Sequence, residues 1–234
     1  MFTNVFTPES WAEAVSVIKS EFLMGIWETF YVTVVSTFFA LVIGLPLGVL
    51  LVITRKDGIR PAPTFNTVLG AVINFLRSIP FILLIAMLIP VTRLVMGTTI
   101  GTTAAVFPLV ISAAPYVARV VEQSLLEVDR GVIEASQSMG SSVWQIIWKV
   151  MLPEALPSLI NGAAVAVTTI LAYTAMVSAV GGGGVGAYAI TKGYQRGKKY
   201  YDFMYCASAI LVLMVQIITI TGTRLTRRLD HRIR

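Results

Sequence analysis

Residues 127–157 read EVDRGVIEASQSMGSSVWQIIWKVMLPEALP, and within them Glu134-Ala135-Ser136 precedes Gly140 and then Val150-Met151-Leu152-Pro153. Long apolar segments flank this polar stretch on both sides. Each flank holds the roughly 20 apolar residues that a helix needs to cross a bilayer. The stretch therefore predicts a polar loop, over residues 122–157, between two membrane-spanning helices.

The composition is that of a membrane protein. Hydrophobic residues make up 56% of the 234 residues and charged residues only 13%, whereas about a quarter of an ordinary soluble domain is charged. The net charge is +6, and basic residues gather after the last apolar segment, at Arg224, Arg227, Arg228, Arg232 and Arg234. Lys and Arg collect beside spans on the cytoplasmic side of membranes. We therefore expect contact with membrane lipid and no nucleic-acid partner.

The apolar segments predict an all-α, polytopic membrane protein with a single transmembrane domain, residues 1–234. Five segments are long enough to span the hydrocarbon core: 29–54, 66–92, 94–118, 158–180 and 203–223. Strand-like alternation is absent, and open strands cannot satisfy their backbone in lipid. Residues 8–24 carry apolar side chains at helical spacing, which predicts an external amphipathic helix along the membrane surface. A partner-docking face is the alternative for that helix.

The number of spans and the basic tail together predict the orientation. An odd number of spans places the two chain ends on opposite sides of the membrane. The tail predicts a cytoplasmic C-terminus, so the N-terminus is expected outside and the loop at 122–157 in the cytoplasm. The segment with Lys192, Arg196, Lys198 and Lys199 would then be external, against the charge rule.

The polar loop is expected to fold as two short helices that meet at a bend. Charged residues between Glu127 and Glu134 suit a first helix that ends near Gly140, where glycine permits the bend. Ser141 or Ser142 can cap a second helix. That helix should stop before Pro153, since proline interrupts helices.

The loop resembles that of the permease subunits of bacterial ATP-driven importers. Their pattern is Glu-Ala-Ala, three residues, Gly, nine residues, Ile, one residue, Leu-Pro, and this chain departs from it conservatively at Ser136 and Val150. The resemblance implies the type I permease fold of ABC importers, with a cytoplasmic coupling helix that docks on a separate ATPase. The residues that it assigns to ATPase coupling are Glu134, Ala135, Ser136, Gly140, Leu152 and Pro153. An ordinary solvated helical hairpin is the alternative.

A second resemblance covers nearly the whole chain. The segments 27–29, 44–48, 77–81, 134–140, 152–157 and 180–186 look like those of the permease of methionine uptake transporters. This resemblance implies a homodimer in the bacterial cytoplasmic (inner) membrane, two ATP-binding cassette ATPase subunits and an external substrate-binding lipoprotein. It also implies a small amino-acid substrate, D- or L-methionine. Nothing in the residue chemistry alone identifies methionine.

No residue constellation supports an enzyme, and no cofactor or metal is expected. Gly181, Gly183 and Gly186 satisfy Gly-x-Gly-x-x-Gly, but they end a span instead of following a strand, so a tight or flexible turn is expected. The sequence has no Gly-x-x-x-x-Gly-Lys-Ser/Thr loop, so a partner chain must hydrolyse ATP. The single His231 and the single Cys206 leave no Ser-His or multi-His site.

Two pairs of glycines have the spacing that allows helices to approach closely. They are Gly44 with Gly48 and Gly97 with Gly101. Packing within one subunit is the favoured interpretation, and a dimer contact is the alternative.

Four residues are candidates for the translocation pathway. Arg77 lies inside a predicted span, where a charge must face protein, water or the interface; a place at the cytoplasmic boundary is the alternative. Thr169, Tyr173 and Met176 share one helical face, and their hydroxyls and thioether suit a zwitterionic amino acid with a thioether tail. Helix packing through Thr and Tyr is the alternative for this face.

The predicted function is that of a permease subunit, which forms the pathway for methionine across the cytoplasmic membrane. An importer of another amino acid, or of a short methionine-containing peptide, is the alternative within transport. A passive channel or membrane scaffold is the alternative from another class.

Overall fold

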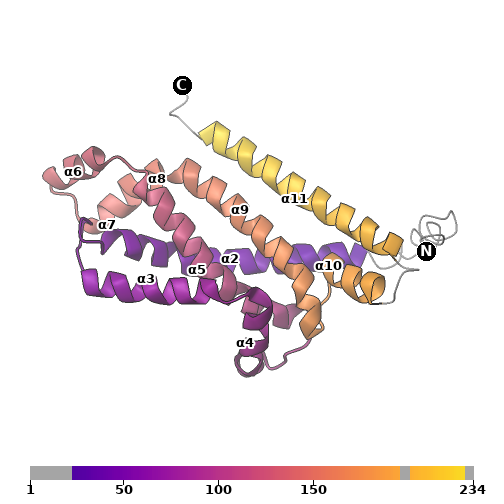
Figure 1. Cartoon of the computed structure of the whole chain (residues 1–234). Helices are drawn as coiled ribbons and strands as arrows, with labels where there is room; N and C mark the ends of the chain where they lie inside the picture. Colours follow the sequence, from indigo (N-terminus) through magenta and orange to yellow (C-terminus); the bar gives the residue numbers. More distant parts are fainter. Residues whose placement is uncertain (1–22, 196–200, 230–234) are drawn as a thin grey trace. The chain divides into compact units, whose positions relative to one another are not determined.

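The computed structural model describes residues 23–195 and 201–229, and all regular structure in these ranges is helical (Figure 1). The all-α prediction is confirmed. Residues 8–22 of the expected amphipathic helix lie outside the described residues. The elements in chain order are α2 (Leu23–Ile53), α3 (Pro63–Ser78), α4 (Phe81–Met96), α5 (Thr102–Leu126), α6 (Arg130–Ser138), α7 (Val143–Ile146), the π-helix η2 (Ile147–Met151), α8 (Leu152–Glu154), α9 (Leu156–Thr174), the 3-10 helix η3 (Ala175–Val180), α10 (Val185–Tyr188), the π-helix η4 (Ala189–Tyr194) and α11 (Tyr201–Leu229).

Among the described residues, four helical segments are long and apolar enough to cross a membrane: Leu23–Ile53, Thr102–Leu126, Leu156–Ser178 and Tyr201–Arg228. A fifth candidate is the pair α3 and α4, which is bent at the break between them. Ile79 is extended there (φ −80°, ψ 123°), because the ring of Pro80 disfavours helical geometry in the residue before it. The segment expected as one span at 66–92 is therefore two helices.

The next helix also begins later than the expected 94–118 segment. α4 ends at Met96, and α5 begins at Thr102. Gly97 and Gly101, on either side of this connection, have φ of 74° and 106°, values that favour glycine. An added Cβ at either glycine would meet nothing within 4 Å. Within this chain the two glycines shape a connection and do not pack helices together, which corrects the prediction of packing within one subunit; the alternative, a dimer contact, stays a prediction.

The described residues form two compact units. Among the described residues, the first unit comprises 23–37, Phe81–Val110, 167–195 and 201–218, and the second comprises Phe38–Pro80, Ile111–Ala166 and 219–229. In the first unit, Val185, Ala189, Phe203 and Ala207 form a buried cluster. A Cβ at Gly193 of η4 would lie 2.8 Å from Met204 Cβ, so η4 packs closely on α11.

The core of the second unit forms where α2, α3 and α5 meet. Leu51, Ile73 and Ala118 are buried together there. A Cβ at Gly44 would lie 2.6 Å from Val117 Cβ, and one at Gly48 would lie 2.5 Å from Val121 Cβ. Both glycines therefore let α2 approach α5 closely within one chain, as expected for this pair.

Candidate functional site

The first helix of the polar loop is α6, and its two ends follow from the sequence. Asp129 caps its N-terminus, where the side-chain Oδ1 accepts from Gly131 N–H at 2.6 Å. At the C-terminus the N–H of Gly140 donates to Gln137 O at 2.9 Å, and Gly140 adopts φ 79°. A left-handed glycine after the last turn is a common helix end. The helix expected to end near Gly140 is present.

The second helix of the loop starts at the expected serine but continues further than expected. Ser142 forms a capping box with Gln145, with Ser142 N–H donating to Gln145 Oε1 at 2.8 Å. The chain then passes through η2 into α8, which contains Pro153. Met151 and Leu152 keep right-handed helical backbone angles across this junction, and the Leu152 N–H donates to Ile147 O. The expectation that the helix stops before Pro153 was wrong.

The six candidate coupling residues differ in exposure. Glu134, Ala135, Gly140 and Pro153 are exposed, and Leu152 is half-buried. The Ser136 side chain is only 4% exposed, so it faces the interior of the second unit. Met139, at the end of α6, is 79% exposed. The outer surface of α6 therefore presents Glu134 and Ala135, with an exposed methionine at its end.

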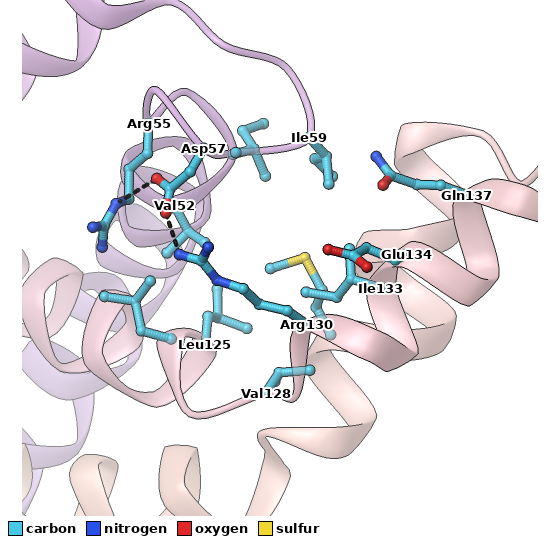
Figure 2. Close-up of a pocket in the computed structure, with 14 residues that line it drawn as sticks. Val52, Arg55, Asp57, Ile59, Leu125, Val128, Arg130, Ile133, Glu134 and Gln137 are labelled. Carbon is cyan, nitrogen blue, oxygen red and sulfur yellow. Dashed lines mark hydrogen bonds and ion pairs between the residues drawn. The ribbon is translucent and has the colours of Figure 1, made fainter.

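A cavity of about 140 Å³ lies beside α6, between this helix and the connection from α2 to α3. Figure 2 shows the Asp57 carboxylate between the Arg55 and Arg130 side chains, with Glu134 and Gln137 across the cavity. Arg55 Nε lies 3.3 Å from Asp57 Oδ1, and Arg130 forms an ion pair and hydrogen bond with Asp57 Oδ2. These ion pairs link the α2–α3 connection to the start of α6.

The pKa of Asp57 is lowered from its ordinary value. The largest cause is a backbone hydrogen bond within the Asp57 residue; desolvation opposes it, and the positive charges of Arg55 and Arg130 reinforce it. Asp57 is therefore ionised at neutral pH and keeps both ion pairs. Because the groups are exposed, the ion pairs contribute little to the free energy of unfolding. Their main effect is to hold the α2–α3 connection beside the start of α6.

A second charged cluster, centred on Arg119 of α5, holds α3 in the second unit. Its Nη1 donates to Glu122 Oε2 at 2.6 Å, and its Nη2 donates at 3.0 Å both to Gly70 O and to Asn74 Oδ1. Arg119 was not singled out from the sequence. The Arg-Glu spacing of three residues signals a helical pair, but the contacts with α3 had no sequence signal.

The candidate pathway residues lie in different units. Thr169, Tyr173 and Met176 belong to the first unit, and Arg77 belongs to the second. Tyr173 is half-buried and stacks on Phe81, with ring centroids 4.5 Å apart and planes 11° apart. Met176 is 42% exposed and lies in η3, so the α-helical spacing used to align it with Tyr173 ends at Thr174.

Arg77 is exposed in the last turn of α3. A positive charge is favourable at that end of a helix, where the backbone dipole is negative. The break at Ile79-Pro80 follows it immediately. The side chain therefore belongs to a helix terminus and not to the middle of a continuous helix.

Comparison with known proteins assigns the family. The model of the "Binding-protein-dependent transport system inner membrane component" family matches residues 41–234. This chain belongs to that family. The predictions of an inner-membrane, multi-pass permease subunit, and of a transport protein rather than an enzyme, are confirmed by this membership.

Individual relatives are similar over almost the full chain. The "Probable D-methionine transport system permease protein MetI" of Vibrio cholerae serotype O1 is 46% identical over 212 residues, which cover 90% of this chain and 92% of that protein. The protein of the same name from Pasteurella multocida is 47% identical over 205 residues, covering 88% and 94%.

A solved structure confirms the permease fold. A chain of the MetNI methionine ABC transporter, in an inward-facing conformation, matches with a TM-score of 0.86 and 44% identity. The match covers 89% of this chain and 96% of that chain. The ABC importer permease fold expected from the sequence is therefore confirmed.

Proposed function

We propose that this chain forms the pathway by which an ATP-driven importer carries methionine, as the D-form, the L-form or both, across the cytoplasmic membrane. The observation that carries the substrate is the 46% identity, over 90% of the chain, to a permease named for D-methionine transport. The match to a chain of a methionine ABC transporter adds to it. The candidate residues Thr169 and Tyr173 of α9, and Met176 of η3, offer hydroxyl and thioether groups suited to such a solute.

The working assembly would be a homodimer with two ATP-binding cassette ATPase subunits and an external substrate-binding lipoprotein. Similarity to a chain of the MetNI transporter supports the ATPase partners, and the family's dependence on a binding protein supports the external one. The N-terminus would lie outside and the C-terminus in the cytoplasm. The basic residues Arg227 and Arg228 in the last turn of α11 support that orientation.

Coupling to the ATPase would occur through the exposed surface of α6. Glu134 supplies a charge and Ala135 a small side chain that permits close approach, while Gly140 sets the bend after them. Ser136 would support α6 from its buried side, and Leu152 with Pro153 would connect the loop to α9. Arg77 is proposed at the margin of the pathway.

The test is uptake of radiolabelled methionine into liposomes that carry this chain with its cognate ATPase and binding protein. Wild type is compared with Glu134→Lys and with the control Glu127→Lys, since Glu127 is also exposed but lies outside α6. We expect ATP-dependent uptake that falls at least about tenfold in Glu134→Lys and is retained in Glu127→Lys. Equal uptake by both variants would remove Glu134 from the coupling surface.

Competition with unlabelled solutes distinguishes the substrate alternatives. Loss of signal with D- or L-methionine, but not with other amino acids or methionine-containing peptides, supports methionine. Uptake that persists without ATP would instead indicate a passive channel.

A further inference from the structure

Two sequence segments with no role in the coupling loop meet in the first unit. The first is Trp27-Glu28-Thr29 on α2, and the second is the glycine segment Gly181–Gly184 with Val185, which begins α10. Glu28 Oε2 accepts from Gly184 N–H at 2.8 Å. Thr29 Oγ1 accepts from Val185 N–H at 2.9 Å. Two consecutive side chains of α2 therefore hold two consecutive amides of a segment 156 positions away.

The Glu28 carboxylate receives further donors from two other elements. Thr102, the first residue of α5, donates its hydroxyl to Glu28 Oε1 at 3.2 Å and accepts from Gly183 N–H at 3.2 Å. Tyr188, the last residue of α10, donates its hydroxyl to Glu28 Oε2 at 3.2 Å. Burial, and then the charge and hydrogen bond of Glu28, raise the pKa of Tyr188, so its hydroxyl stays a donor. We call Glu28, Thr29, Thr102 and Tyr188 the Glu28 cluster.

The glycines of the segment can pack against this cluster because they have no side chain. A Cβ at Gly183 would lie 2.6 Å from the Glu28 carboxylate carbon, and a Cβ at Gly184 would lie 2.8 Å from Thr29 Oγ1. Gly184 also has φ 105°, a backbone angle that residues with a side chain rarely adopt. A side chain at either position would therefore collide with Glu28 or Thr29, and hydrogen bonds to a carboxylate are among the stronger ones.

The cluster is connected to η3, which carries the candidate pathway residue Met176, by the packing of α10 on Ala175. A Cβ at Gly186 of α10 would lie 2.6 Å from Ala175 Cα, the first residue of η3. Met176 follows Ala175, and Gly181 ends η3 with φ 68°. A movement of Gly184 and α10 away from Glu28 would therefore displace both ends of η3, which carries Met176.

We propose that Glu28 is a positioning residue for transport: its carboxylate fixes the Gly181–Gly184 segment and α10 against the starts of α2 and α5, and thereby sets the place of η3 and Met176. This role in transport rests on the proposed importer function. The fixing of the segment does not, because it concerns hydrogen bonds within the first unit.

Hydrogen exchange of the assembled complex tests the fixing directly. Glu28→Gln keeps the shape but loses the charge, and its single carbonyl oxygen cannot serve all the donors that the carboxylate serves. Hydrogen bonds to a charged group correspond to roughly 10- to 100-fold in equilibrium population. We expect amide exchange in peptides covering 181–188 to speed up at least about tenfold in Glu28→Gln and in Thr102→Val. Exchange should be unchanged in the control Thr103→Val, the exposed neighbour on α5.

Transport of the same complexes tests the positioning role. Glu28→Gln should lower methionine uptake at least about tenfold, while the complex stays assembled and its ATPase stays active. Gly183→Ala should lower uptake in wild type but add little in a Glu28→Ala background, because the added Cβ would then meet no carboxylate.

Each outcome decides one part of the proposal. Unchanged exchange in Glu28→Gln overturns the fixing of the segment, whatever the uptake. Faster exchange with normal uptake overturns the role in transport. Losses from Gly183→Ala and Glu28→Ala that simply add would show that the glycine is required for another reason. If the wild-type complex carries no methionine, the proposed substrate fails, and exchange alone still decides whether Glu28 fixes the segment.

Discussion

Phe81 and Tyr173 stack face to face, with ring centroids 4.5 Å apart and planes 11° apart. Phe81 begins α4, directly after the Pro80 break, and Tyr173 lies in the last turn of α9. Phe81 is buried, whereas Tyr173 is half-buried. One face of the tyrosine ring is therefore used for packing within the first unit, so a solute contact would have to use the hydroxyl or the other ring face.

Because one face of the Tyr173 ring packs on Phe81, two substitutions of Tyr173 should have different effects. Tyr173→Phe keeps the stack and should leave thermal stability unchanged, so any loss of methionine uptake reports the hydroxyl. Tyr173→Ala removes the stack and should couple to Phe81→Ala by about 1 kcal/mol in a double-mutant cycle. Thermal unfolding in detergent measures both. Strictly additive losses in the cycle would contradict an energetic role for the stack.

The space around two glycines, Gly48 of α2 and Gly70 of α3, predicts that substitution by alanine will change the stability of the protein in opposite directions. At Gly48 an added Cβ would lie 2.5 Å from Val121 Cβ and 2.6 Å from Ala118 O, so Gly48→Ala should destabilise by about 1–3 kcal/mol through overpacking. At Gly70 of α3 the nearest atom would be 3.4 Å away, so Gly70→Ala should be neutral or stabilising, as in an open helix position. Melting temperatures of the two variants check the contrast.

Local signals in the sequence predicted the local structure well. Gly140 and Ser142 bound the two short helices because a left-handed glycine and a capping serine act within a few residues of themselves. Pro153 was misjudged because the backbone stays helical through the π-helix η2 directly before it, which no local sequence signal indicated. The spacing of Gly44 and Gly48 predicted close approach but could not name Val117 or Val121 as the neighbours.

Contacts between distant segments could not be predicted in this way. Glu28 and Gly184 are 156 positions apart, and Arg119 and Asn74 are 45 positions apart. No periodicity or spacing relates such pairs; only the folded chain does. For Gly97 and Gly101 the signal in the sequence was false. Their spacing is that of a helix-packing motif, although both residues lie at the connection between α4 and α5.

The ion pair between Arg119 and Glu122 predicts that replacing Arg119 alone destabilises the protein more than replacing both residues. The Arg119 and Glu122 side chains are only 20% and 14% exposed. Arg119→Met leaves Glu122 without its ion pair, which should destabilise by up to about 3–5 kcal/mol, whereas removing both charges of a buried pair is often near neutral. We therefore expect Arg119→Met/Glu122→Leu to melt at a higher temperature than Arg119→Met. A double variant that is less stable than the single one would contradict this account.

Acidification should loosen the link between the α2–α3 connection and α6. The pKa of Asp57 in the folded chain lies below its ordinary value of 3.8, so its contribution is present above about pH 4 and is lost as pH falls through the lowered pKa. The difference in melting temperature between wild type and Asp57→Asn should be small, constant from about pH 5 to 8, and shrink below about pH 4. A difference that grows with acid would contradict the ion pairs with Arg55 and Arg130.

Variants of Gly140 can distinguish two possible reasons why glycine is needed there. One is its left-handed backbone conformation, and the other is its lack of a side chain. Gly140 adopts φ 79°, and a Cβ there would meet nothing within 4 Å, so any cost within the chain comes from the backbone alone. A left-handed residue other than glycine costs about 1–2 kcal/mol, and asparagine is the best tolerated. Gly140→Asn should thus keep most methionine uptake, Gly140→Ala less, and the β-branched Gly140→Val least. If the bare backbone at Gly140 is instead what an ATPase contacts, Gly140→Asn should fail at least as badly as Gly140→Ala while α6 stays intact, and the order of uptake decides between the two roles.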